Sequence, residues 1–235
     1  MKNLLLASTS TLHEQKYLEY LLPEIRKHFS CCSEILFIPY ARPGGISHED
    51  YTGLAASALE RINIKVRGLH EFTDPAKAIQ NAEAIFTGGG NTFLLVQQLY
   101  SHKLLPVLKE TLLNDTPYLG TSAGTNIAGL TMRTTNDMPI VYPPNFTTLG
   151  LVPFNFNAHY LDPDPNSTHK GETRETRIKE FHHFNSQPVV GLREGSWLEV
   201  KGEEITLKGG KSARIFEAEK LPYEIENESS LKDLN

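Results

Sequence analysis

The pentapeptide Gly120-Thr121-Ser122-Ala123-Gly124 constrains the fold of this chain more than any other stretch of sequence. The apolar run 118–120 leads into it and small residues follow it, a G-x-S-x-G pattern typical of a strand that turns sharply into a helix. Glycines on both sides of the serine leave no Cβ atom to clash in so tight a turn. The hydroxyl of Ser122 then projects at the carboxyl end of the strand, where backbone N–H groups can receive an oxyanion. The pattern therefore predicts a strand, an elbow and a helix, with Ser122 as a candidate nucleophile.

Short apolar runs alternate with helical patterns through the first half of the chain. We expect strands at 4–7, 34–39, 65–69, 84–87 and 118–120, and helices at 14–29, 50–62, 75–81, 93–100 and 104–113. We expect Pro23 to interrupt the first of these helices and Asp74 to cap the third. A repeated succession of strand and helix predicts an α/β fold with a parallel sheet and helices on both faces.

The second half is less regular. We expect a turn at 163–168, a helix at 173–184, and short strands at 149–153, 188–192, 196–200, 204–207 and 213–216, the last ones antiparallel. The acidic and polar residues after Pro222 are expected to fray. No segment is long enough to serve as a linker between domains, so the sequence predicts one domain over 1–222 and a polar tail over 223–235.

Composition limits the class of protein. The formal net charge is −5 and the basic clusters are short, so we expect neither nucleic acid nor a membrane surface as partner. The apolar start at 1–7 is too short for a signal peptide and reads as a first buried strand. Cys31 and Cys32 are adjacent and no C-x-x-C pair occurs, so the default expectation is a reduced, cytoplasmic protein without a metal site.

A serine hydroxyl needs a base to take its proton and a third group to orient that base. Among 9 histidines, His159 ends an apolar-alternating run and is the candidate base, although a structural histidine fits the same spacing. Two acids compete to orient it. Glu194 follows the strand predicted at 188–192, where a doubly wound sheet places active-site groups. Asp137 lies in the polar loop 134–139; as alternatives, Glu194 is a turn residue and Asp137 a cap.

The chain order Ser122, His159, Glu194 is informative. In α/β-hydrolases the acid precedes the histidine. The order found here resembles that of class I glutamine amidotransferases, with serine in place of their cysteine.

A second glycine cluster, Gly88-Gly89-Gly90-Asn91, follows a predicted strand and opens a helix. The spacings of a dinucleotide fingerprint and of a Walker A loop are both absent. We interpret the cluster as an oxyanion loop, with one N–H from Gly89 or Gly90 and another from Ala123; the alternative is a plain tight turn.

Several strings together resemble the peptidase E family of α-aspartyl dipeptidases. They are 88–93, 120–124, 134–141, 159–160, 171–175 and 191–195, and the resemblance runs from the first strand to about Phe216. One departure is Ala158, where the family pattern leads us to expect proline before the histidine.

The resemblance implies a cofactor-independent serine peptidase with a flavodoxin-like α/β fold, related to class I glutamine amidotransferases. Such an enzyme removes an N-terminal aspartate from dipeptides and some short peptides. Ser122 would attack the peptide carbonyl, with His159 as general base and then general acid. Either Glu194 or Asp137 would be the acidic member, and Asp137 outside this role would hold the ammonium group of the substrate.

An aspartyl substrate also needs a cation for its side-chain carboxylate, and the planar fork of arginine suits a carboxylate best. Arg174 is the first choice, because it lies in the family-like string 171–175; Arg177, Arg133 and Arg193 are the other candidates. A solvated charged helix face is the alternative for Arg174 and Arg177. Rival functions are a glutaminase-like amidohydrolase, an enzyme that cuts an aspartate–arginine polymer, and a non-catalytic binding protein. Monomer and homodimer both stay open.

Overall fold

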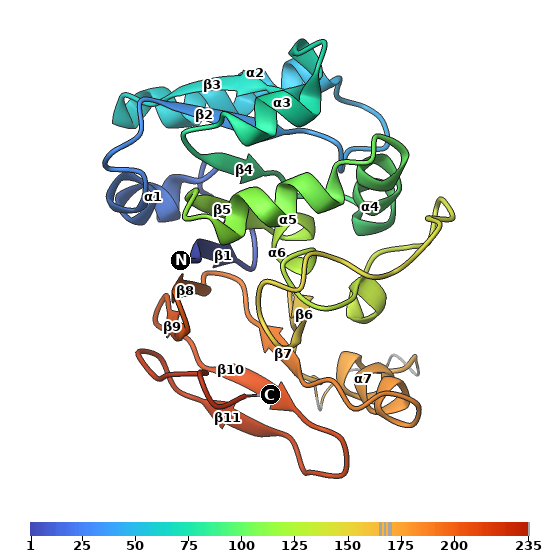
Figure 1. The fold of residues 1–235 in the computed structure, drawn as a ribbon. Helices are drawn as coiled ribbons and strands as arrows, with labels where there is room; N and C mark the ends of the chain where they lie inside the picture. The colour runs from blue at the N-terminus through green and yellow to red at the C-terminus, as the bar shows by residue number, and fades with distance from the viewer. Residues whose placement is uncertain (165, 167, 169–170, 235) are drawn as a thin grey trace.

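Two β-sheets organise the chain in this computed structural model, which describes residues 1–164, 166, 168 and 171–234 (Figure 1). The large sheet has the order β3-β2-β4-β5-β1-β8-β9, with bounds Lys65–Gly68, Glu34–Ile38, Ile85–Thr87, Tyr118–Thr121, Asn3–Ala7, Trp197–Lys201 and Glu204–Lys208. The small sheet has the order β11-β10-β7-β6, with bounds Tyr223–Ile225, Ala213–Phe216, Val189–Leu192 and Asn155–Ala158. His169 and part of the turn predicted at 163–168 lie outside the described residues.

The large sheet is mostly parallel, as expected. Its strands β1 to β5 pair in parallel, and β8 and β9 continue it as antiparallel strands. Counted from β2, the run β3-β2-β4-β5 has the strand order 2-1-3-4 of a flavodoxin-like sheet. Strand β1 takes the fifth place, beside β5. The predicted α/β class, with antiparallel strands towards the C-terminus, is confirmed.

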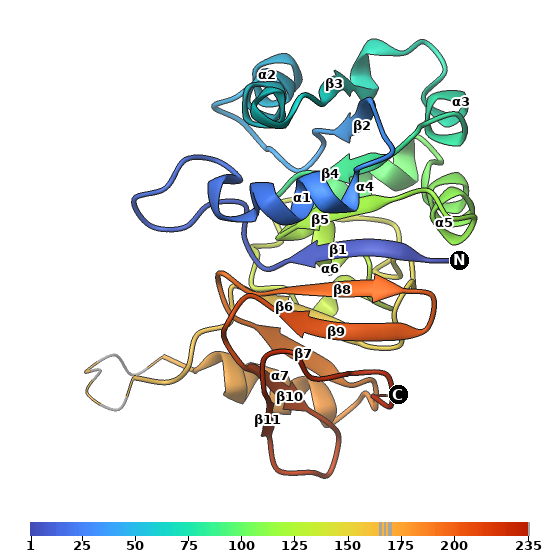
Figure 2. The same cartoon turned by 90° about the vertical axis from the view of Figure 1, so that its left-hand side faces the viewer.

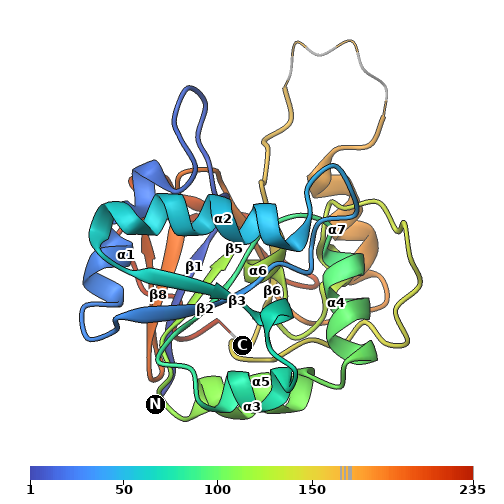
Figure 3. The ribbon, with the colours of Figure 1, turned by 90° about the horizontal axis from the view of Figure 1, so that it is seen from above.

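Helices cover both faces of the large sheet, because successive side chains of each buried strand point to opposite sides. Leu4 and Leu6 pack with helices α3, α4 and α5, whereas Leu5 and Ala7 pack with α1 and α2. The bounds of these helices are Leu22–His28 (α1), His48–Leu59 (α2), Pro75–Gln80 (α3), Thr92–Ser101 (α4) and Leu105–Leu113 (α5). Figure 3 shows α1 and α2 on one side of the strands and α3 and α5 on the other.

The first predicted helix is much shorter than expected. A 3-10 turn at Glu19–Leu21 leads into α1, and most of the segment 10–18 is a loop. Leu18 has φ 59°, which ends any helical path there. Pro23 does not interrupt a helix but lies in the first turn of α1, where its missing N–H leaves no bond unmade. Asp74 caps α3 as predicted, since its side chain accepts a hydrogen bond from the N–H of Lys77.

The strand predicted at 149–153 is wrong. The N–H groups of this apolar run donate instead to carbonyls just after α6 (Ala123–Asn126), with Leu149, Gly150 and Leu151 bonded to Ile127, Gly129 and Ala128. The run is buried like a strand but satisfies its backbone locally. Apolar pattern alone does not distinguish these two cases.

Residues 223–234 do not fray, contrary to the sequence-based expectation. Strand β11 pairs with β10, and the N–H of Leu231 donates to the carbonyl of Ile205 in β9. Leu231 and Leu234 are 1% and 5% exposed and join the main hydrophobic core. That core takes residues from both sheets, which lie next to each other in the ribbon of Figure 2.

Candidate active site

The elbow forms where the sequence predicts it. Ser122 directly follows β5 and precedes α6, with φ 53° and ψ −108°, a strained backbone conformation for a residue with a side chain. A Cβ atom on Gly124 would lie 2.2 Å from the carbonyl oxygen of Thr87, and one on Gly120 would lie 2.6 Å from the oxygen of Gly124. The turn therefore needs glycine at both positions.

His159 lies within hydrogen-bond reach of this serine. It follows the last residue of β6 with φ 56°, so the chain leaves the strand in a sharp turn. Its Nε2 atom is 2.9 Å from Oγ of Ser122, and its side chain is 35% exposed. A neutral Nε2 at this distance can accept the hydroxyl proton.

Glu194 occupies the other side of the imidazole. It lies two residues after β7, and its Oε1 atom is 2.6 Å from Nδ1 of His159. Because β6 and β7 are parallel neighbours with Ala158 opposite Leu192, the segments that leave the two strands emerge together. A carboxylate at Nδ1 favours the tautomer with its proton there and leaves Nε2 free to accept from Ser122.

Asp137 makes different contacts. Its Oδ2 atom accepts hydrogen bonds from the N–H of Thr92, at 2.7 Å, and from the hydroxyl of Thr135, at 2.9 Å. A carboxylate on the first N–H of α4 complements the positive end of that helix. The neighbouring Asn136 donates to the carbonyl of Ala158, so the loop braces the strand that ends at His159. Of the two predicted acids, Glu194 is therefore the one at the imidazole.

The glycine cluster lies against the elbow. A Cβ atom on Gly89 would be 3.0 Å from Cβ of Ser122, and Gly90 has φ 144°. The hydroxyl of Tyr51 donates to the carbonyl of Gly89 at 2.9 Å, so the N–H of Gly90, in the same trans peptide, points away from Tyr51. Among the described residues, no oxygen accepts a hydrogen bond from the N–H of Gly89 or Gly90. Ala123 is the first residue of α6, where N–H groups have no partner within the helix.

Arg174 has the environment expected of an anion-binding residue. It is the first residue of α7 (Arg174–His182), and its Nη1 atom is buried without a hydrogen-bond partner among the described residues. Burial lowers the pKa of its guanidinium, and the nearby charge of Glu194 acts in the opposite direction. The Arg174 side chain is only half-buried, but a buried donor atom without a partner is costly unless a bound anion compensates for it.

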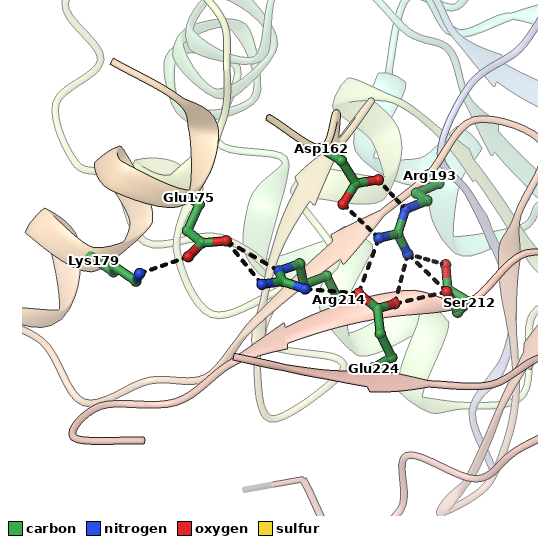
Figure 4. A network of polar contacts seen from close by, with 7 residues as sticks. All are labelled: Asp162, Glu175, Lys179, Arg193, Ser212, Arg214 and Glu224. Atoms are coloured by element: carbon green, nitrogen blue, oxygen red, sulfur yellow. Dashed lines mark hydrogen bonds and ion pairs between the residues drawn. The ribbon is translucent and has the colours of Figure 1, made fainter. Parts of the chain in front are cut away.

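The other three candidate arginines lie in two different environments. Arg133 and Arg177 line one cavity of about 430 Å³ together with Phe93, Phe146, Phe181, Met132 and Glu180. Arg193 is fully engaged in ion pairs with Asp162 and Glu224 (Figure 4), so it is not available to a substrate carboxylate. The interpretation of Arg193 as a substrate-binding candidate is wrong, because its donors already have carboxylate partners.

Ser8 is a site residue that sequence reasoning missed. Its fully buried hydroxyl accepts a hydrogen bond from the N–H of His159, at 2.9 Å, and donates to the carbonyl of Leu192, at 2.7 Å. It directly follows β1, and the rule that polar residues after parallel strands gather at one edge applies to it as well. In the sequence it reads only as the start of a polar loop.

Within the described ranges, no cluster of three or more His, Cys, Asp or Glu side chains has a geometry able to hold a metal ion. In the same part of the chain, none of the helices combines the length and apolar character that crossing a membrane requires.

Fold and site together define a class, a serine-type hydrolase on a mostly parallel α/β sheet. Comparison with known sequences identifies the family within this class. The family description "Peptidase family S51" matches residues 4–208, and the chain belongs to this family.

Relatives agree with this assignment. Peptidase E of Streptomyces coelicolor is 49% identical over 232 residues, covering 99% of this chain and 94% of the relative. A Drosophila melanogaster protein named "Probable alpha-aspartyl dipeptidase" is 46% identical over 221 residues, covering 93% of this chain and 91% of its own. A crystal structure of a peptidase from an acI-B1 actinobacterium has a TM-score of 0.69 at 17% identity, covers 98% of this chain and 96% of that one, and supports the fold. The resemblance to the peptidase E family is confirmed.

Proposed function

We propose that this chain is a serine dipeptidase that hydrolyses dipeptides, and some short peptides, with a free N-terminal L-aspartate. The observation that carries the chemistry is the continuous hydrogen-bonded chain from Ser122 through His159 to Glu194. The aspartyl specificity is supported by the name of the Drosophila relative and by the Nη1 atom of Arg174, which is buried and has no hydrogen-bond partner among the described residues.

The proposed reaction has two halves, and the imidazole of His159 transfers protons in both. Nε2 of His159 takes the hydroxyl proton as Oγ of Ser122 attacks the peptide carbonyl, and Glu194 stabilises the imidazolium that forms. The N–H of Ala123 and that of Gly89 or Gly90 receive the developing oxyanion. The imidazolium then protonates the leaving amine. Water, activated by the same imidazole, hydrolyses the acyl-enzyme and frees the aspartate.

Two charged side chains of the protein bind the two charged groups of the substrate's aspartyl residue, its side-chain carboxylate and its free ammonium group. Arg174 binds the side-chain carboxylate, with Arg177 and Arg133 as the alternatives. Asp137 holds the free ammonium group through Oδ1, the oxygen that accepts no hydrogen bond within the described part of the chain. Both charges would then be required in the substrate, which restricts the enzyme to an unblocked N-terminus.

A panel of X-Leu dipeptides tests the function. We expect turnover of Asp-Leu, little of Glu-Leu or Asn-Leu, and none of N-acetyl-Asp-Leu. The Ser122→Ala variant should be inactive, with an unchanged circular dichroism spectrum. Equal rates for all X-Leu peptides would refute the specificity, and turnover of glutamine or of an aspartate–arginine polymer in place of Asp-Leu would support the rival functions.

Arg174→Lys tests the assignment of the carboxylate-binding residue. Lysine keeps the charge but loses the two-pronged geometry, so we expect kcat/KM for Asp-Leu to fall about tenfold or more, equivalent to about 1.4 kcal/mol. The matched control is Arg177→Lys, one helical turn further along α7. If only the control loses activity, Arg177 takes the role; if neither does, both assignments fail.

A further inference from the structure

A continuous network of ion pairs and hydrogen bonds joins segments that are far apart in sequence (Figure 4). Its members are Lys179, Glu175, Arg214, Glu224, Arg193, Asp162 and Ser212. None of them belongs to the proposed reaction. The network contains three acids and three bases, so its formal charge is zero.

Arg193 forms one end. Its Nε and Nη2 atoms donate to the two carboxylate oxygens of Asp162, at 2.9 and 2.8 Å. Its Nη1 and Nη2 atoms donate to Glu224, at 2.8 and 3.1 Å, and Nη1 also donates to the carbonyl of Ser212. Its guanidinium carbon lies 5.6 Å from the centre of the buried Tyr160 ring. Two bidentate contacts hold this side chain in a single position.

Arg214 on β10 is the second arginine at the centre of the network. Its Nε and Nη2 atoms lie 3.2 and 3.1 Å from Oε2 of Glu175, and its Nη1 atom donates to Glu224 at 3.1 Å. Glu175 lies in the first turn of α7 and is 18% exposed. Glu224 on β11 is thus the only carboxylate shown in Figure 4 that contacts both arginines.

Two members of this network, Arg193 and Glu175, are sequence neighbours of proposed functional residues. Arg193 precedes Glu194, and Glu175 follows Arg174. Tyr160, beneath Arg193, follows His159. Fixing a side chain at two points also fixes the peptide that carries it, so anchoring Arg193 restricts Glu194, and anchoring Glu175 restricts Arg174.

We propose that Arg193, Glu224 and Arg214 form a positioning network with Glu224 at its centre. This network fixes the position of the catalytic carboxylate Glu194 relative to the substrate-binding Arg174. The Arg193 end acts on the chemical step and the Arg214 end acts on binding of the aspartyl side chain. The inference rests on the proposed function, because it assigns the two ends to catalysis and to substrate binding.

Electrostatics support a rigid network. Hydrogen bonds from Arg193 are the main reason that the pKa of Glu224 falls to about 2, so this carboxylate keeps its charge at working pH. The side chains of Arg193, Arg214 and Glu224 are 16%, 26% and 32% exposed, which makes these pairs less screened by solvent than surface ion pairs. The last strand, expected to be a frayed tail, thereby contacts Arg193, the residue before Glu194, through Glu224.

The test compares Arg193→Gln, Arg214→Gln and Glu224→Gln by two measurements. The first is kcat and KM for Asp-Leu. The second is the rate at which a fluorophosphonate modifies Ser122, which needs the histidine and its carboxylate but not Arg174. For Arg193→Gln we expect kcat and the modification rate to fall about tenfold with KM within twofold. For Arg214→Gln we expect KM to rise about tenfold with the modification rate within twofold, and for Glu224→Gln we expect both changes.

Glu199→Gln is the matched control, because Glu199 is 22% exposed and paired with Lys201 at 2.6 Å on β8, outside the network. It should keep wild-type values in both measurements. If Arg193→Gln does not fold, Asp162→Asn loosens the same end from a carboxylate that is 53% exposed. Wild-type kcat, KM and modification rates in all the network variants would overturn the proposal, even if their melting temperatures fell.

Failure of the proposed function would be distinguishable. A wild-type enzyme that reacts with the fluorophosphonate but does not cleave Asp-Leu would refute the substrate assignment and, with it, the binding half of the network. The modification rates of Arg193→Gln and Asp162→Asn would still decide the catalytic half.

Discussion

The buried hydroxyl of Ser8 accepts a hydrogen bond from the backbone N–H of His159 at 2.9 Å. The same hydroxyl donates to the carbonyl of Leu192, two residues before Glu194. One side chain at the end of β1 therefore ties together the turns that carry the proposed base and its acidic partner. His159 has φ 56° at this point, and the bond helps to hold that uncommon conformation.

Ser8→Ala should weaken both stability and activity. It leaves the N–H of His159 without its acceptor, which costs about 1–3 kcal/mol, whereas the carbonyl of Leu192 keeps its hydrogen bond from the N–H of Tyr160. We also expect kcat for Asp-Leu to fall about tenfold as His159 loses its fixed backbone. Denaturant unfolding and steady-state kinetics measure the two effects. Thr148→Val is the control, since the Thr148 hydroxyl donates to the carbonyl of Gly129 away from the elbow; it should lose stability only. An unchanged kcat in Ser8→Ala would refute the role of this bond in positioning.

Gly124→Ala should disrupt the elbow. The added Cβ atom would lie 2.2 Å from the oxygen of Thr87, so β4 or α6 has to move, at a cost of about 1–3 kcal/mol or more. We expect activity to fall at least a hundredfold, because Ser122 sits two residues away. The matched control is Gly53→Ala in the middle of α2, where a Cβ atom meets nothing within 4 Å. That change should stabilise the protein by about 0.5–1 kcal/mol. Full activity in Gly124→Ala would show that the elbow tolerates a side chain at this position.

Acid should weaken the fold partly through Glu224. The pKa of its carboxylate in the folded protein is about 2, below its ordinary value of 4.5, mainly because Arg193 donates hydrogen bonds to it. Since the folded value is the lower one, Glu224 contributes stability above pH 4.5 and loses this contribution as the pH falls towards 2. Glu224→Gln should therefore flatten the fall in unfolding free energy between pH 4.5 and 2, measured by urea denaturation. Glu226→Gln, at an exposed residue directly after β11 for which no ion pair is found among the described residues, is the control and should keep the wild-type slope. Equal slopes in all three proteins would count against the ion pair.

Leu231→Ala tests whether the C-terminal segment is part of the core. Leu231 is 1% exposed, and removing its side chain should destabilise the protein by about 2–5 kcal/mol. Leu221→Ala, at a side chain that is 87% exposed, should change stability by no more than about 0.5 kcal/mol. Thermal or urea unfolding distinguishes the two variants. Similar small effects in both would mean that the tail frays after all.

Local sequence patterns predicted most of the fold. Strand–helix alternation identified the parallel sheet, and the glycines around Ser122 predicted the elbow, since both depend on the conformational preferences of a few adjacent residues. The pattern failed where an apolar run had another way to satisfy its backbone, as at 149–153. It also failed at 223–234, where two buried leucines in a polar segment were too weak a signal for an ordered segment.

For the candidate site, the sequence alone identified the residue types: a serine at an elbow, a histidine at a strand end, two possible acids and four arginines. It did not decide between Glu194 and Asp137, or between Arg174 and Arg193. That choice depends on which strands pair, because the parallel register of β6 and β7 brings the turns after Ala158 and Leu192 together. Hydrogen bonds and ion pairs act over about 3 Å, and the partners here are 31 to 35 positions apart in sequence, so only the folded chain brings Glu194 to His159 and Asp162 to Arg193.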